Sequence, residues 1–413
     1  MPRSAETQPA AGKMTALEKR SSISLASIFA LRMLGLFLIL PVFAVYAQQL
    51  PGGDNNFLVG LTLGIYGLTQ SVLQIPFGAA SDRFGRKPVI VIGLVLFVIG
   101  SVIAALGTNI WTVMIGRAIQ GAGAISAAVT ALIADSVRER VITKAMALVG
   151  ASIGLTFALS LVLAPPLTEL WGVPGLFWLT AVLSVGAIGI ILRVVPDAPM
   201  SLDTTDEQEH QPWQKIAFNP QLMRLNAGIF FLHAVQMALF VVIPTRLVEM
   251  GLPVLHHWYI YLPAVLIGFA VMMKPIIWAE RHQRTTSLLR ANVGLLGIVF
   301  LLFAFLMHSV WEIAFLVTLF FISFNILEAT LPGLISRVAP PKDKGLALGI
   351  YNTTQSFGLF VGGAAGGWIA QHFSAESVFF TSTFAMLLWF LLALGLKEPK
   401  SRQHHEQGEA IQV

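Results

Sequence analysis

The sequence predicts an all-α membrane protein of twelve transmembrane helices, arranged as two six-helix bundles in a pseudo-two-fold repeat. Three observations support this fold class. Only 11% of the 413 residues are charged and 56% are hydrophobic, whereas about a quarter of a soluble domain is charged. The charges gather in short islands between apolar runs of about 20 residues, the length that spans a membrane as a helix. The two halves also repeat one another at a spacing of 200 residues.

Twelve apolar runs are predicted to form the spanning helices. They cover residues 24–46, 57–80, 88–107, 110–135, 143–167, 173–195, 222–248, 256–280, 285–307, 310–337, 344–371 and 375–396. The first run lacks a small-residue cleavage site, so we expect it to be retained as a helix. The predicted organisation is a tail at 1–23, a first bundle at 24–195, an acidic linker at 196–221, a second bundle at 222–396 and a tail at 397–413.

The distribution of basic residues predicts the topology. Loops on the side of the termini hold 22 of the 26 Lys and Arg residues, and the opposite loops hold only Arg246. Cytoplasmic loops of membrane proteins are enriched in Lys and Arg. We therefore expect both termini in the cytoplasm of a multi-pass cell-membrane protein, which in a Gram-negative cell lies in the inner membrane. The net charge of +5 follows from this topology and does not indicate nucleic-acid binding.

The internal repeat supports the division into halves. KAMALVGASIGLTFA from Lys144 aligns with KGLALGIYNTTQSFG from Lys344. Asp82, with a basic residue four positions later, has a counterpart in Glu280, which is followed at the same spacing by Arg284. Parallel repeats of this kind are typical of transporters, whose substrate site lies near the membrane midplane between the halves.

One charged loop, GAASDRFGRKP at 78–88, connects the second and third predicted helices. Asp82 and Asp135 lie at helix C-termini, where a carboxylate is unfavourable by up to ~1 kcal/mol. Arg86 can offset both. The helix at 344–371 begins on the same side, and its N-terminus would accept Asp82. That contact would hold this side closed and would break when it opens. The alternative, charges that only fix topology, is our expectation for Arg83 and Lys87.

This loop resembles the signature G-x-x-x-D-R-x-G-R-[KR] of the major facilitator superfamily. GRAIQGAGA from Gly116 resembles the R-x-x-Q-G element of its drug/proton antiporter branch. The resemblance covers almost the whole chain and implies the major facilitator fold, with a part in proton coupling for Arg117. It also implies a conformational latch, formed by Gly78, Asp82, Arg83, Gly85, Arg86 and Asp135. The branch usually ends its fifth helix in G-P-x-x-G-G, where this chain has Ala164-Pro165-Pro166. That departure bears on antiport and not on the fold.

Ionisable residues at membrane depth are costly and indicate function. Glu328 is the only carboxylate well inside a predicted span, and a carboxylate is the simplest carrier of a coupling proton. His233 is the other group that titrates near neutral pH. A structural ion pair for Glu328 and a neutral packing role for His233 are the alternatives. Arg117 could instead pair with a backbone carbonyl or a neighbouring glutamine, and the partner of Arg32 is not predicted.

Uncharged polar residues form stripes at helical spacing. Such stripes face a watery cavity or another helix and not lipid, and hydrogen bonds between helices are the alternative to a cavity. The predicted proton and substrate residues are Glu328, His233, Arg32, Arg117, Tyr66, Gln70, Asn325, Asn352 and Gln355.

The sequence thus predicts proton-coupled efflux of small amphiphilic compounds by alternating access, with the proton gradient as energy source. We expect no cofactor, no metal and no nucleic-acid partner, and a monomer in the lipid bilayer. At membrane depth three fixed cations accompany one acid, a charge balance that would favour anionic substrates. The alternative function within the transporter class is therefore a symporter or exporter of an organic anion. A non-transporting membrane sensor or scaffold is the alternative of another class. An enzyme is disfavoured, because the sequence has no metal-ligand cluster, phosphate loop or nucleophile constellation.

Overall fold

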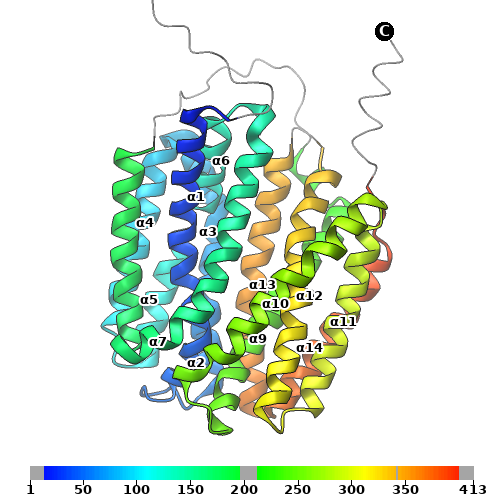
Figure 1. Ribbon diagram of the computed structural model, residues 1–413. Coiled ribbons are helices and arrows are strands. Elements are labelled where there is room, and N and C mark those ends of the chain that lie inside the picture. The colour runs from blue at the N-terminus through cyan, green and yellow to red at the C-terminus, as the bar shows by residue number, and fades with distance from the viewer. Residues whose placement is uncertain (1–13, 196–211, 341–342, 400–413) are drawn as a thin grey trace, which may run out of the picture.

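The computed structural model describes residues 14–195, 212–340 and 343–399, and these residues form helices and short connections without a strand (Figure 1). Residues 1–13 of the predicted tail at 1–23, residues 400–413 of the predicted tail at 397–413, and residues 196–211 of the predicted linker lie outside the described residues. Figure 1 shows two groups of upright helices side by side, with the start of the first helix and the end of the last helix at the same end of the bundle. We call this the terminal end, and the other the opposite end.

The first half of the chain contains the spans of the first predicted bundle. Its helices are α1 (Ala16–Phe37), α2 (Leu40–Ala47), α3 (Asn56–Phe84), α4 (Arg86–Ala105), α5 (Ile110–Ala122), α6 (Ser126–Ser136) and α7 (Glu139–Arg193). Helices α1 and α2 together form one span, as do α5 and α6. Helix α7 is two helices joined at Gly172, whose φ of 65° interrupts the helical geometry. A positive φ is a conformation that glycine adopts readily.

The second half begins with the short helix α8 and then forms the second bundle. Its elements are α8 (Trp213–Ala217), α9 (Pro220–Glu249), the 3₁₀ turn η1 (Val254–His256), α10 (Trp258–Arg281), α11 (Thr285–Phe305), α12 (Val310–Val338), α13 (Lys344–His372) and α14 (Ala375–Leu394). Counting α7 as two helices, the described residues contain the twelve predicted spans.

By length and hydropathy alone, ten helical segments of the described residues could cross a membrane. Two features account for the difference from twelve. One of the ten segments, Lys144–Arg193, contains both helices joined at Gly172. Helix α13 is not among the ten, because glycines and polar residues dilute its apolar content.

The first helix begins at Ala16, earlier than the predicted residue 24. A capping box explains the earlier start: the backbone N–H of Thr15 donates to Glu18 at 2.7 Å, and that of Glu18 donates to the Thr15 hydroxyl at 3.1 Å. The Glu18 carboxylate also accepts a hydrogen bond from Arg138 Nε at 2.8 Å. Polar residues thus extend this helix beyond its apolar run.

The two halves meet through α3 and α13 at the opposite end of the bundle. The backbone N–H of Asn56 donates to Oε1 of Gln371 at 2.6 Å. A Cβ atom on Gly363 would lie 2.4 Å from the Gly60 carbonyl oxygen, so only glycine permits this approach. Toward the terminal end of α13, a Cβ atom on Gly345 or Gly349 would meet nothing within 4 Å. The halves are therefore closely packed at the opposite end, and the terminal part of α13 is open.

Candidate functional site

Glu328, His233 and Gln355 come together between three helices of the second half. Glu328 lies on α12, His233 on α9 and Gln355 on α13. Nε2 of Gln355 lies 2.8 Å from Nε2 of His233 and donates to Oε1 of Glu328 at 3.4 Å. Oε2 of Glu328 lies 3.8 Å from Nε2 of His233. The structure therefore joins the two predicted proton-carrying residues through one amide.

With the Gln355 amide in this orientation, its hydrogen bonds correspond to one tautomer of His233. The nitrogen of a glutamine amide is a donor only, so Nε2 of His233 accepts from Gln355. Nδ1 of His233 then carries the proton and faces the Ile229 carbonyl oxygen at 3.3 Å. This is a neutral imidazole. A proton arriving at Nε2 would remove the acceptor that Gln355 uses and would favour the contact with Glu328 instead.

The surroundings of the cluster are apolar on one side and open on the other. The His233 ring packs edge-on against Phe324 at 5.8 Å between centroids, and the His233 side chain is 6% exposed. The Glu328 side chain is 33% exposed, although its Oε2 is buried without a hydrogen-bond partner. Glu328 and Gln355 are therefore partly exposed, whereas His233 is buried.

A second polar cluster lies in the first half, around Arg32 of α1. Its Nη1 donates to the Ser126 hydroxyl and its Nη2 to Oε1 of Gln70, both at 2.8 Å. Nε2 of Gln70 donates to the Ser356 hydroxyl of α13 at 2.9 Å. This last bond crosses from one half of the molecule to the other.

Arg117 of α5 lies beside the same cluster. Its guanidinium donates to Oε1 of Gln120 at 3.1 Å and to the Leu63 carbonyl at 3.4 Å. Tyr66 of α3 lies between the two arginines: the guanidinium carbon of Arg117 is 5.1 Å from its ring centroid, and that of Arg32 is 5.8 Å. Both distances are within the range of a cation–π interaction.

The two clusters meet at neighbouring residues of α13. Gln355 contacts Glu328 and His233 in the second half, while Ser356 accepts from Gln70 of the first half. Gln355, which contacts Glu328 and His233, is therefore adjacent in the chain to Ser356, which accepts the hydrogen bond that joins the halves.

Some predicted site residues lie elsewhere. Asn325 packs toward α10, where a Cβ atom on Gly268 would lie 2.7 Å from its Nδ2, and that nitrogen has no hydrogen-bond partner. The backbone carbonyl of Asn352 accepts a bond from Ser356 within α13. Ser126 was not predicted. Its signal in the sequence was the glycine pair Gly121 and Gly123, which precedes the interruption between α5 and α6.

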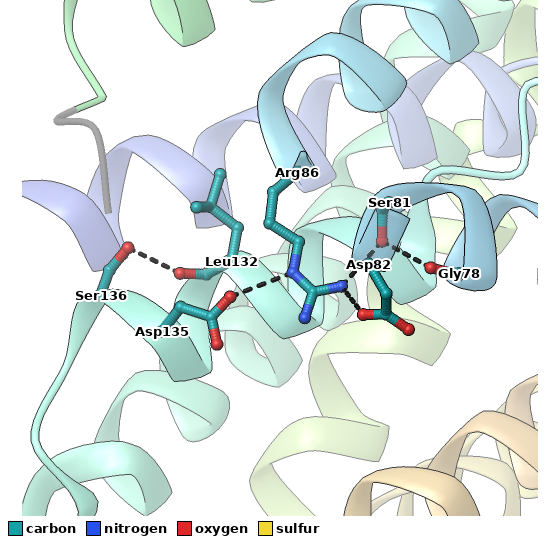
Figure 2. Close-up of polar contacts among 7 residues, drawn as sticks. All are labelled: Gly78, Ser81, Asp82, Arg86, Leu132, Asp135 and Ser136. Atoms are coloured by element: carbon teal, nitrogen blue, oxygen red, sulfur yellow. Dashed lines mark hydrogen bonds and ion pairs between the residues drawn. The ribbon is translucent and has the colours of Figure 1, made fainter. Parts of the chain in front are cut away.

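The predicted latch residues gather at the terminal end of the first half, as Figure 2 shows. Nε of Arg86 donates to Oδ2 of Asp135 at 3.0 Å, and its Nη1 contacts both Asp82 and the Ser81 hydroxyl. The Ser81 hydroxyl in turn donates to the Gly78 carbonyl at 2.7 Å. Arg86 thus joins the carboxylates that end α3 and α6, as the sequence predicts.

Two further latch residues shape the turn between α3 and α4. Gly85 has a φ of 92°, which favours glycine and reverses the chain between the two helices. The Arg83 guanidinium lies over the Phe84 ring at 5.4 Å. The Asp82 side chain is 67% exposed, and its hydrogen bond and ion pair in this conformation are to Arg86.

Comparison of the sequence with known proteins shows the family to which the chain belongs. The model of the Major Facilitator Superfamily matches residues 25–327 and 276–412. The chain is 42% identical over 388 residues to the inner membrane transport protein YajR of Escherichia coli K12, covering 94% of this chain and 85% of YajR. It is 25% identical over 348 residues to the multidrug resistance protein MdtH of Proteus mirabilis, covering 81% of this chain and 83% of MdtH.

A solved structure shows the same fold. The crystal structure of the human organic anion transporter MFSD10 superposes with a TM-score of 0.69 at 16% identity, over 92% of this chain and 100% of that one. At this identity the likeness concerns the arrangement of helices and not the site.

Proposed function

Because this chain belongs to the major facilitator superfamily and is a multi-pass membrane transporter, we propose that it exports small amphiphilic compounds in exchange for protons. MdtH is named a multidrug resistance protein and YajR an inner membrane transport protein. These names favour export across an inner membrane, and we assign that direction and location to this chain. The proton gradient supplies the energy, and the working unit is a monomer.

The observation that carries proton coupling is the contact of Glu328 and His233 with Gln355. A carboxylate and an imidazole 3.8 Å apart can share or exchange one proton. Glu328 is partly exposed, and we assign it the uptake of the proton. The proton changes the partners of Gln355, and the next residue, Ser356, holds the bond to Gln70 in the other half. Protonation thereby biases the contact between the halves.

Alternating access requires two conformations, and this structure supports one of them. The halves pack through Gly60 and Gly363 at the opposite end, and α13 is open at the terminal end. In the other conformation we propose that the terminal end closes and Asp82 docks on the N-terminus of α13. The carboxylate is exposed and held by Arg86 in readiness for that contact.

The excess of basic residues at the terminal end supports cytoplasmic termini. With that orientation the terminal end is open to the cytoplasm in the present conformation, while the hydrogen bond from Gln70 to Ser356 still joins the halves at depth.

A flux experiment tests the proposed function. Purified protein is reconstituted in liposomes that contain a pH-sensitive dye, a proton gradient is imposed, and cationic, neutral and anionic amphiphiles are added. We expect substrate-triggered proton flux with wild type and none with Glu328→Gln. The sign of the flux separates exchange from symport.

Flux that persists in Glu328→Gln would exclude this carboxylate as the proton carrier. Absence of flux with every compound would favour a non-transporting role.

A further inference from the structure

The arginine cluster of the first half contains two buried cations. Arg32 is 1% exposed and Arg117 is fully buried. Both lie over the Tyr66 ring, so the two charges share one small region. Within the described part of the chain, neither arginine forms an ion pair with a carboxylate. Buried charges are normally paired, because removing an ion from water is costly. The two buried charges therefore make this region electrostatically favourable for an anion.

The cluster also has unused donors and a third source of positive potential. Nε of Arg32, Nε of Arg117 and the Tyr66 hydroxyl are buried and have no hydrogen-bond partner among the described residues. Arg32 donates to Ser126, the first residue of α6, where the N-terminus of a half-helix carries partial positive charge. Half-helix N-termini of this kind point at anionic substrate groups in several transporter folds.

The cluster borders the interface between the halves. Arg32 donates to the oxygen of the Gln70 amide, and the nitrogen of that amide donates to Ser356 across the interface. When the halves part at this level, Gln70 loses the Ser356 hydroxyl as acceptor. Its N–H then faces the opened space beside the Arg32 cation. An oxyanion placed there would accept from Gln70 and would neutralise Arg32.

We propose that the transported compound is an organic anion whose acidic group binds Gln70 and Arg32 at the position that the Ser356 hydroxyl occupies in this conformation. The inference rests on the proposed function, because alternating access is what parts the halves. Ser356 and the acidic group compete for one donor. Substrate binding therefore favours the conformation in which the halves are apart at this level.

Binding to the full-length protein in lipid nanodiscs tests the proposal without a proton gradient. Three probes share one ring system and differ in charge: 2-naphthoate, 2-naphthalenemethanol and 2-naphthylmethylammonium. Isothermal titration calorimetry is expected to show 2-naphthoate binding about tenfold or more tightly than the alcohol, since a hydrogen bond to a charged group is the stronger one. Equal affinity for the three probes, or no binding of 2-naphthoate, would overturn the proposal.

Three variants locate the binding site. Ser356→Ala removes the competing hydroxyl and leaves the cations intact, so the affinity for 2-naphthoate should rise by about threefold or more. Arg32→Gln should abolish the preference for the carboxylate. Lys274→Gln removes an exposed cation of α10 and is the matched control, with binding as in wild type. Unchanged affinity in Ser356→Ala contradicts the proposal even if Arg32→Gln fails to fold.

The two proposals fail in distinguishable ways. Proton coupling is measured as flux in Glu328→Gln, whereas the anion site is measured as binding of 2-naphthoate to the wild type and to the Arg32 and Ser356 variants. Charge-selective binding without proton flux would remove proton coupling and leave the anion site. Proton flux triggered only by cationic compounds, with no charge preference in binding, would remove the anion site and leave proton coupling.

Discussion

At the residue scale, Gln355 links the proton-carrying groups to the interface between the halves. It contacts Glu328 and His233, and its neighbour Ser356 bonds to Gln70. Neither a carboxylate nor an imidazole alone could transmit a change of protonation to the other half. In the proposed coupling the amide does so, because its nitrogen contacts both titratable residues.

Gln355→Leu tests this link. The variant keeps the size of the side chain approximately and removes both hydrogen bonds, so we expect substrate-triggered proton flux in liposomes to fall about tenfold or more. Thr354→Val is the matched control, because the Thr354 hydroxyl bonds only to the Ile350 carbonyl of its own helix. Wild-type flux in Gln355→Leu would exclude the amide from coupling.

Asp82 is the exposed member of the latch, and its role belongs to the conformation closed at the terminal end. Asp82→Asn removes the charge that an α13 N-terminus would bind, so we expect slower transport with folding intact. Arg83→Ala, whose guanidinium contacts the Phe84 ring, should transport at nearly the wild-type rate. Equal transport by Asp82→Asn and wild type, measured as initial substrate uptake, would rule out the latch.

At the element scale, the predictable part of the fold is the set of apolar spans, because their length is fixed by the bilayer. The interruption between α5 and α6 could not be predicted in the same way, because it involves a contact between distant segments, Arg32 with Ser126. The early start of α1 has a local cause, the capping box of Thr15 and Glu18, which lies outside the apolar run. Likewise, the spacing of Asn325 and Glu328 places them on one side of α12, but packing against Gly268 takes Asn325 out of the cluster.

Helix α13 is the element that moves in this account, and its glycines offer a matched test. Gly363→Ala would place a Cβ atom 2.4 Å from the Gly60 carbonyl oxygen. Such overpacking costs about 1–3 kcal/mol, so we expect about a tenfold shift in population away from the conformation closed at the opposite end. Gly349→Ala has open space around its Cβ and should leave the populations unchanged. In both variants, the yield of disulfide cross-linking between the halves at the opposite end measures the population of the conformation closed there.

Helix α11 is capped from the far end of the chain by Glu398. Its carboxylate accepts hydrogen bonds from the backbone N–H groups of Thr285 and Thr286, each at 2.8 Å, and from the Thr286 hydroxyl. Burial alone would raise the pKa of Glu398, but these hydrogen bonds hold it below its usual value.

A lowered pKa gives stability that is present above the unfolded-state pKa, about 4.3, and that is lost as the pH falls through the lower folded-state pKa. We expect Glu398→Gln to reduce stability by about 1 kcal/mol at pH 7. The difference from wild type should close below about pH 4. Thermal unfolding in nanodiscs measures the stability of Glu398→Gln and of the wild type at each pH. A stability difference that does not change with pH would contradict the capping role of the charge.

At the scale of the whole molecule, two bundles are joined at one end by glycine packing and by the hydrogen bond from Asn56 to Gln371. A hydrogen bond between Gln70 and Ser356 joins them beside the cluster of Glu328 and His233. The repeat in the sequence predicts the two bundles. Which polar residues bridge them depends on the relative position of the halves, a property that no local pattern carries. The central claim is that protonation of Glu328 changes that position.

The most direct measurement is the distance between the two halves as a function of pH. The chain contains no cysteine, so Ile75→Cys on α3 and Leu346→Cys on α13, both exposed positions, accept spin labels without background. Double electron–electron resonance in nanodiscs is expected to show a distance distribution that shifts between low and high pH. The same labels in the Glu328→Gln background should show no such shift. An identical pH response in Glu328→Gln, or none in the wild-type background, would contradict the account.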